Sequence, residues 1–307
     1  MLRLLSLFII ICLLPCGASF AQGQKEEAPP SAVKAPDADF TELKHTKSGR
    51  IDKIIDGLTV LLKDGTIIRL ASIDIPDFSI WRDAPYSEEA LALLQKTLPE
   101  GTEVMMYQTR MAKKGRITRM HHELAHLVTK KDNIWIQGLL LANGLARVYT
   151  APDAAEMLDQ MLKTEQEARK SKIGIWADDS PYLILTPETA EKASGEFAIV
   201  EGVVESSASV RNDIYLNFGK DWKKDFTIKI SPEDRKKLAH KGIDPLGMAH
   251  QKLRVRGWIR DYNGPMIELE DPSHLEYPLT EPAETPSEPI LQNNDKSPRV
   301  ESKFLTN

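Results

Sequence analysis

The stretch from Ile54 to Asp77 constrains the fold of this chain more than any other segment. Two apolar runs flank the pair Asp64-Gly65, and an Asp-Gly pair in that setting predicts a tight hairpin between two strands. Arg69 falls near the middle of the second strand, and Asp74 falls near its end. We therefore expect a guanidinium and carboxylates at one rim of a sheet, where such groups can hold a phosphate and a divalent cation.

Three short motifs of this stretch resemble those of the staphylococcal-nuclease-like (thermonuclease) family. They are Asp56-Gly57-Leu58-Thr59, Arg69, and Asp74-Ile75-Pro76-Asp77. Three later segments resemble further landmarks of the family in the same order, namely Lys114-Gly115-Arg116, Asn143-Gly144-Leu145-Ala146-Arg147-Val148 and Lys172-Ile173-Gly174-Ile175-Trp176. The resemblance covers residues 47–176, and we expect a nuclease-like domain at residues 43–178.

The resemblance implies calcium-dependent hydrolysis of phosphodiesters in DNA or RNA. It implies that Arg69 and Arg116 neutralise the phosphate, that Asp74 and the carbonyl of Ile75 hold calcium, and that Asp77 positions the attacking water. Charge stabilisation and an aligned water are what such a cleavage needs. The second arginine is ambiguous, since six extra residues, 117–122, follow Arg116 and bring Arg119 into competition.

Three positions depart from the family pattern. Leu58 stands where the family has its first metal-binding Asp, Ile75 replaces a Thr, and Asp77 replaces the longer Glu. A leucine cannot ligate calcium, and a base displaced by a methylene can lose about 100-fold in rate. We expect calcium to be weakly held and catalysis to be weak or lost. A binding module for nucleic acid or protein, or a scaffold of the cell envelope, are the alternatives.

The segment His122-Glu123-Leu124-Ala125-His126 matches the zinc-protease pattern His-Glu-x-x-His. That pattern holds zinc only on a helix, where residues four apart share a face. The resemblance places this segment at the start of a strand, so we expect no zinc site here.

The periodicity of residues 43–178 predicts a small barrel with packed helices, mainly β with α, of the OB type. We expect three strands within 47–73, further strands at 102–109 and 123–129, and helices at 87–98, 136–143 and 153–171.

A second unit is expected at 195–278, because three strands, a helix and two strands are the element order of an OB barrel. Its 13 basic and 14 acidic residues balance, which leaves nucleic-acid binding, protein docking and structural support open. We interpret Arg254 and Arg256 as one solvated strand face. The candidate stacking and charged side chains are Tyr215, Phe218, Trp222, Phe226, Trp258, Tyr262, Lys223, Lys224 and Arg260.

The charge of the whole chain, −5, gives no sign of a polyanionic partner. The distribution is more informative, since residues 43–176 contain 20 basic and 17 acidic side chains. Five basic residues fall between Arg110 and Arg119. Such a cluster is either a solvated loop or a phosphate-binding surface.

Residues 1–21 have the pattern of a secretory signal, with Arg3, an apolar core and a small-residue cleavage site. This predicts an exported protein, periplasmic or secreted, with no membrane span after cleavage; an uncleaved anchor is the alternative. Cys12 and Cys16 both lie in this segment, so we expect no disulfide in the mature chain. Residues 22–42 and 279–307 are expected to be disordered, and residues 179–194 to be a connector.

Overall fold

The computed structural model describes residues 32–76, 85–111, 115–152, 154–221 and 223–279. From Val33 onward these residues belong to one compact unit, which contains two large sheets. Among the described helices, none is long and apolar enough to cross a membrane.

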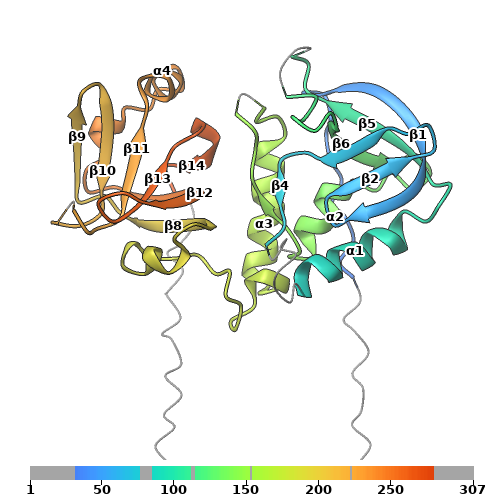
Figure 1. Cartoon of the computed structure of the whole chain (residues 1–307), viewed down its shortest axis with the longest axis horizontal. Helices are drawn as coiled ribbons and strands as arrows, with labels where there is room; N and C mark the ends of the chain where they lie inside the picture. Colours follow the sequence, from blue (N-terminus) through green and yellow to red (C-terminus); the bar gives the residue numbers. More distant parts are fainter. Residues whose placement is uncertain (1–31, 77–84, 112–114, 153, 222, 280–307) are drawn as a thin grey trace, which may run out of the picture. The chain divides into compact units, whose positions relative to one another are not determined.

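The first sheet closes into a five-stranded barrel in the order β1-β2-β3-β6-β5 (Figure 1). Its strands are β1 (Lys44–Asp56), β2 (Thr59–Leu62), β3 (Ile67–Leu70), β5 (Glu103–Gln108) and β6 (Glu123–Thr129). All neighbours are antiparallel except β3 and β6, which run parallel. The predicted barrel is confirmed.

The predicted hairpin joins β2 to β3. The backbone N–H of Gly65 donates to the carbonyl of Leu62 over 2.9 Å, and the N–H of Thr66 donates to the Asp64 carboxylate over 3.0 Å. Gly65 has φ +85°, a left-handed conformation that glycine adopts without steric cost. The turn thereby fixes the register that places Arg69 opposite Thr59.

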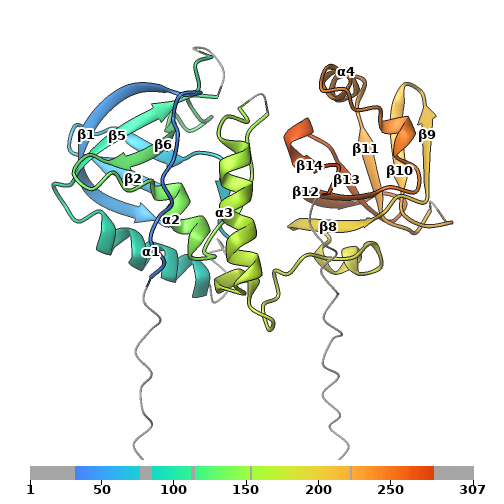
Figure 2. The ribbon, with the colours of Figure 1, turned by 180° about the vertical axis from the view of Figure 1, so that it is seen from behind.

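Three helices and a short two-stranded ladder accompany the barrel. They are α1 (Pro85–Thr97), α2 (Ile136–Ala142), α3 (Leu158–Lys170), β4 (Ile73–Asp74) and β7 (Arg147–Val148), and β4 pairs with β7. Figure 2 shows α2 and α3 side by side. The helix expected from residue 153 begins only at Leu158, because Met157 adopts a left-handed φ of 61° that a right-handed helix cannot include.

The prediction of disorder for residues 22–42 is wrong for the later part of that segment. Residues 33–42 lie against the barrel, where Phe40 stacks on Tyr107 with 4.6 Å between ring centroids. The N–H of Val33 donates to the Asn143 side chain over 2.7 Å, and that side chain returns a bond to the Val33 carbonyl. Burial of an aromatic ring stabilises this segment, despite the proline and charge around it.

The second sheet follows a short 3-10 helix, Pro187–Ala193, inside the expected connector. Its strands pair in the order β9-β10-β11-β13-β12, and β8 and β14 also pair with β12. Its elements are β8 (Phe197–Val203), β9 (Ser206–Val210), β10 (Asp213–Asn217), β11 (Thr227–Ile230), α4 (Pro232–His240), β12 (Lys252–Asp261), β13 (Pro265–Glu268) and β14 (Leu275–Glu276).

This pairing repeats the strand order of the first barrel, with β8 and β9 taking the place of its long first strand. The sequence did not indicate β9, whose residues Ser-Ser-Ala-Ser-Val lack apolar alternation, nor the two-residue β14. Whether the unit is an OB-like domain stays a prediction; the pairing order is consistent with it.

The interpretation of Arg254 and Arg256 as a solvated face is wrong. Each of the two residues is only 1% exposed. Arg254 donates to Glu201 over 2.6 Å and to Glu276 over 3.0 Å. The alternation of Arg with Leu and Val correctly reflected two faces of β12, but the acidic partners that make the second face a buried one lie far away in sequence.

Arg256 reaches from β12 to the first barrel. It donates to both oxygens of Glu165 on α3 over 3.1 Å each, to the carbonyl of Val148 over 2.7 Å, and to Glu276. Glu165 is fully buried and also accepts from Arg169 over 3.0 Å. A desolvated bidentate pair of this kind is geometrically specific. Through it and the bond to Val148, β12 is hydrogen-bonded to α3 and β7.

We predict that Arg256→Leu lowers the free energy of unfolding by about 3–5 kcal/mol, since it leaves a buried carboxylate without its main partner. Urea unfolding of the purified chain measures this. The matched control is Arg260→Leu on the exposed end of the same strand, which should change stability by about 0.5 kcal/mol or less. Equal effects of the two variants would contradict the assignment.

The same cluster predicts a loss of stability in acid. The Arg256 and Arg254 guanidinium groups lower the pKa of Glu276 to about 2, against the opposing effect of burial. Because the pKa is lower in the folded than in the unfolded chain, this stabilisation is present above the ordinary pKa near 4.5 and is lost as pH falls toward 2. Urea midpoints measured across that window should fall less steeply for Glu276→Gln than for the wild type.

Candidate functional site

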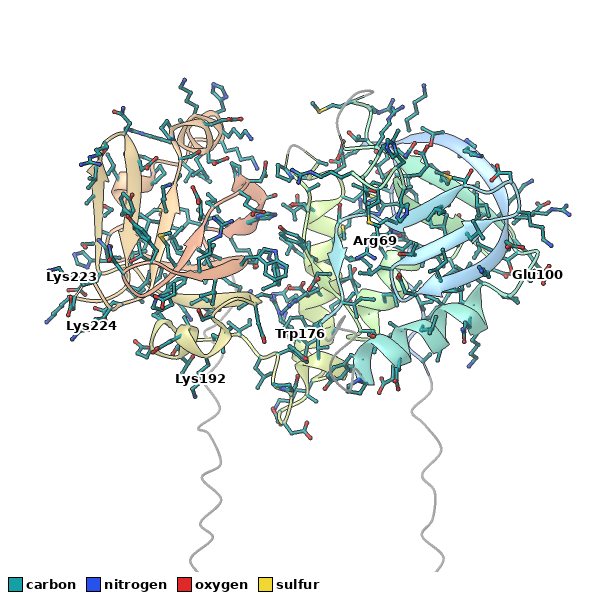
Figure 3. All side chains as sticks on the ribbon, in the orientation of Figure 1. Arg69, Glu100, Trp176, Lys192, Lys223 and Lys224 are labelled. Carbon is teal, nitrogen blue, oxygen red and sulfur yellow. The ribbon has the colours of Figure 1, made fainter. Side chains whose placement is uncertain are left out.

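Arg69 lies at the mouth of the first barrel with about a third of its side chain exposed. Its Nη1 donates to the hydroxyl of Thr59 over 3.1 Å and lies 3.7 Å from the Asp56 carboxylate. Burial lowers the pKa of Arg69, and the charges of Asp56 and Asp74 oppose that shift. Arg69, which Figure 3 labels, thus belongs to one electrostatic group with Asp56 and Asp74, whereas the sequence led us to expect Asp74 and Asp77 beside it.

Asp74 has a partner that the sequence did not reveal. Its Oδ2 accepts from Nε of Arg147 over 2.9 Å, and the two residues are directly paired across β4 and β7. The Arg147 side chain is only 6% exposed, and its guanidinium lies 4.3 Å from the ring centroid of Phe197 on β8. A buried guanidinium therefore already neutralises the carboxylate expected to bind calcium.

Arg116 lies on the other side of β6 from Arg69. Its carbonyl accepts from the N–H of Leu124 over 2.7 Å, and Leu124 is paired with Arg69. Two strand spacings therefore separate the two backbones, about 10 Å. The Arg116 Nε donates to the Thr109 carbonyl over 2.8 Å, which holds the side chain beside the barrel mouth.

Leu58 and Ile75 are core residues, each 1% exposed. The Leu58 N–H donates to the Asp56 carboxylate over 2.7 Å, so its backbone faces the site while its side chain does not. Asp77 lies outside the described residues. Within the part of the chain that the structure describes, no three His, Cys, Asp or Glu side chains converge.

The described donors by themselves do not fit calcium. A calcium ion takes six to eight oxygen ligands, usually including several carboxylates. Of the two described carboxylates, Asp74 is paired with Arg147 and Asp56 lies beside Arg69. The Ile75 carbonyl alone cannot replace them.

A model of the family "Staphylococcal nuclease homologue" matches residues 67–178. This part of the chain is a staphylococcal-nuclease-like domain. The nuclease-like domain includes β3, β6, β7 and α3, hence Arg69, Asp74, Arg116 and Arg147.

Similar proteins include a "Probable endonuclease lcl3" of Pyrenophora tritici-repentis, 32% identical over 154 residues, covering 46% of this chain and 55% of that protein. A "Probable endonuclease LCL3" of Komagataella phaffii is 32% identical over 123 residues, covering 38% and 51%. An "Uncharacterized protein MJ1439" of Methanocaldococcus jannaschii is 27% identical over 161 residues, covering 45% and 75%. The chain thus spans about half the length of the two similar endonuclease-named proteins.

The His-Glu-x-x-His segment of the nuclease-like domain lies at the start of a strand, as predicted: β6 begins at Glu123, one residue after His122. Trp135 Nε1 donates to Nδ1 of His126 over 3.3 Å, and burial lowers the pKa of His126 to about 3. Glu123 accepts from Gln108 over 2.9 Å. His126 is thus a buried core residue, and Glu123 is hydrogen-bonded to Gln108 of the neighbouring strand β5.

Arg147 is the residue of this site that sequence reasoning missed. It stands in the quoted Gly-Leu-Ala-Arg motif, so its position was visible, but nothing in the motif assigned it a partner. A two-residue ladder such as β4–β7 leaves no periodic signal.

We predict that Leu58→Asp alone creates no calcium site and costs about 4 kcal/mol of stability, because it buries an unpaired charge. The double variant Leu58→Asp with Arg147→Gln frees Asp74 and should gain a calcium-dependent rise in melting temperature. Thermal unfolding with and without millimolar calcium measures both. The control is the double variant Leu58→Asp with Arg110→Gln, which should show no rise in melting temperature with calcium. A calcium-dependent rise for Leu58→Asp alone would contradict the prediction.

Proposed function

We propose that this protein binds DNA or RNA through the mouth of its nuclease-like domain, and that calcium-dependent cleavage is weak or lost. The ion pair between Asp74 and Arg147 is the observation that carries the proposal. It engages the carboxylate of Asp74, while the Arg69 guanidinium on the neighbouring strand is about one-third exposed to solvent. The buried Leu58 supports the same conclusion.

The described side chains suit phosphate binding more than bond cleavage. A partly exposed guanidinium can donate two parallel hydrogen bonds to a phosphate, and Arg69 is about one-third exposed. Arg116 lies on the other side of β6, about 10 Å from Arg69 between backbones. Calcium, where it is bound, would add Lewis-acid stabilisation of the leaving charge, but the described carboxylates are engaged by arginines.

Two alternatives follow from specific observations. The endonuclease names of the similar proteins favour a working phosphodiesterase. The balanced charge of residues 195–278 favours a scaffold or a protein-docking role for the second sheet, with a partner in the cell envelope. We propose export to the periplasm or the medium from the pattern of residues 1–21, which lie outside the described residues.

We predict that the purified chain binds a single-stranded oligonucleotide with an affinity that falls steeply with salt. Arg69→Gln should weaken binding for all sequences and reduce the slope of log affinity against log salt by about 1. Fluorescence anisotropy at several salt concentrations measures the slope, and a thermal melt checks that the variant is folded.

The companion measurement is a nuclease assay in millimolar calcium and in chelator. We expect little cleavage in either condition. Family-typical digestion that chelator abolishes and Arg69→Ala removes would refute the loss of catalysis. Absence of any salt-dependent oligonucleotide binding would instead favour the scaffold.

A further inference from the structure

A β-hairpin at the barrel mouth begins at the site residue Arg116 and extends beyond the site described above. It spans residues 116–124, which we call the mouth hairpin. Ile117 bridges to Glu123, the N–H of Thr118 donates to the His122 carbonyl over 2.8 Å, and the N–H of His121 donates to the Thr118 carbonyl over 3.0 Å. The turn is thus hydrogen-bonded, with Arg119 and Met120 at its tip. It contains the six residues, 117–122, that are extra relative to the family pattern.

The mouth hairpin exposes apolar side chains. Met120 at the tip is 76% exposed and Ile117 is 59% exposed, and Met111 just before the hairpin is 50% exposed. Exposing large apolar side chains to water is unfavourable, and their concentration in one short segment usually marks an interaction surface. These side chains give the segment an apolar exposed surface that a partner with apolar surface can cover.

The charge of this segment limits the partner. From Arg110 to His122 the sequence contains no acidic residue, whereas Arg110, Arg116 and Arg119 are all basic. The partner must therefore present negative charge together with apolar surface. Nucleic acid does so, since phosphates flank the flat apolar faces of the bases. An anionic membrane is the other such surface.

The position of the hairpin favours nucleic acid. Its last residue, Leu124, is paired with Arg69 across β3 and β6, and its first residue, Arg116, bonds to Leu124. The hairpin therefore grows out of the same edge of the mouth that carries the two phosphate-binding arginines. A nucleic-acid strand bound at Arg69 would therefore pass close to the residues where the hairpin joins the barrel.

We propose that the mouth hairpin is a base wedge: Met120 inserts between neighbouring bases of a nucleic acid whose phosphates are bound at the mouth, while Arg119 contacts the adjoining backbone. Methionine and isoleucine are among the side chains that proteins insert between base steps. The inference rests on the proposed nucleic-acid binding, and it adds a second contact that unstacks the strand locally.

Oligonucleotides that carry a single 2-aminopurine test the wedge, because the fluorescence of this base rises when it leaves the stack. We expect the full-length wild type to raise the fluorescence of the base nearest the hairpin, as identified by moving the label along the strand. Met120→Ser should abolish that rise with only a modest loss of affinity. Arg119→Ala should lower the affinity and reduce the salt slope by about 1.

The matched control is Val210→Ser, which changes another exposed apolar side chain, 51% exposed, at the end of β9. It should leave both fluorescence and affinity unchanged. The wedge is refuted if the wild type binds the oligonucleotide without a fluorescence rise, or if Met120→Ser retains the rise. It is also refuted if Met120→Ser loses binding to phosphatidylglycerol vesicles and keeps the wild-type oligonucleotide response.

Failure of the wild type to bind any oligonucleotide at low salt has a different meaning from failure of the wedge. It would refute the proposed function, and the wedge with it, before any hairpin variant is compared. Anisotropy with Arg69→Gln distinguishes the proposed nucleic-acid binding from the proposed wedge, since that change weakens binding without removing the hairpin.

Discussion

The two-residue strand β7 is the point on which the rest of the structure depends. Arg147 of this strand pairs with Asp74 at the barrel mouth over 2.9 Å. The next residue, Val148, accepts a bond from Arg256 of the second sheet over 2.7 Å and donates to Glu165 of α3 over 2.6 Å. The candidate site, α3 and the second sheet are thus connected through two consecutive residues, Arg147 and Val148. Because the groups are buried, removing a partner is more costly than it would be at a surface.

That arrangement places the Arg69 guanidinium near a carboxylate, Asp74, that already has a cationic partner. The barrel mouth contains charges of both signs, and Arg147 engages the carboxylate of Asp74. Phe197 of β8 covers the Arg147 guanidinium at 4.3 Å, so the second sheet contributes to holding it on Asp74. The second sheet therefore has a physical effect on the mouth of the first barrel, although residues 195–278 carry no net attraction for polyanions.

The barrel, its hairpin and the position of Arg69 could be predicted because their signals are local. The pair Asp64-Gly65 determines a turn within four residues, and alternating apolar residues determine which face of each strand is buried. Other predictions failed where a local pattern had two physical meanings. Arg254 and Arg256 alternate with apolar residues in the same way on a solvated face and on a buried ionic one. The start of α3 moved because one left-handed residue, Met157, interrupted an otherwise suitable pattern.

The sequence by itself determined the family resemblance, the approximate positions of the barrel strands and the leucine at position 58 where the resemblance implies an Asp, since each depends on residue identity at a fixed spacing. Only the tertiary structure decided which charges meet. Asp74 and Arg147 are 73 residues apart, and Glu165 and Arg256 are 91 apart. The partner of a buried charge is chosen by packing between distant elements, and no short-range pattern of residues records that choice.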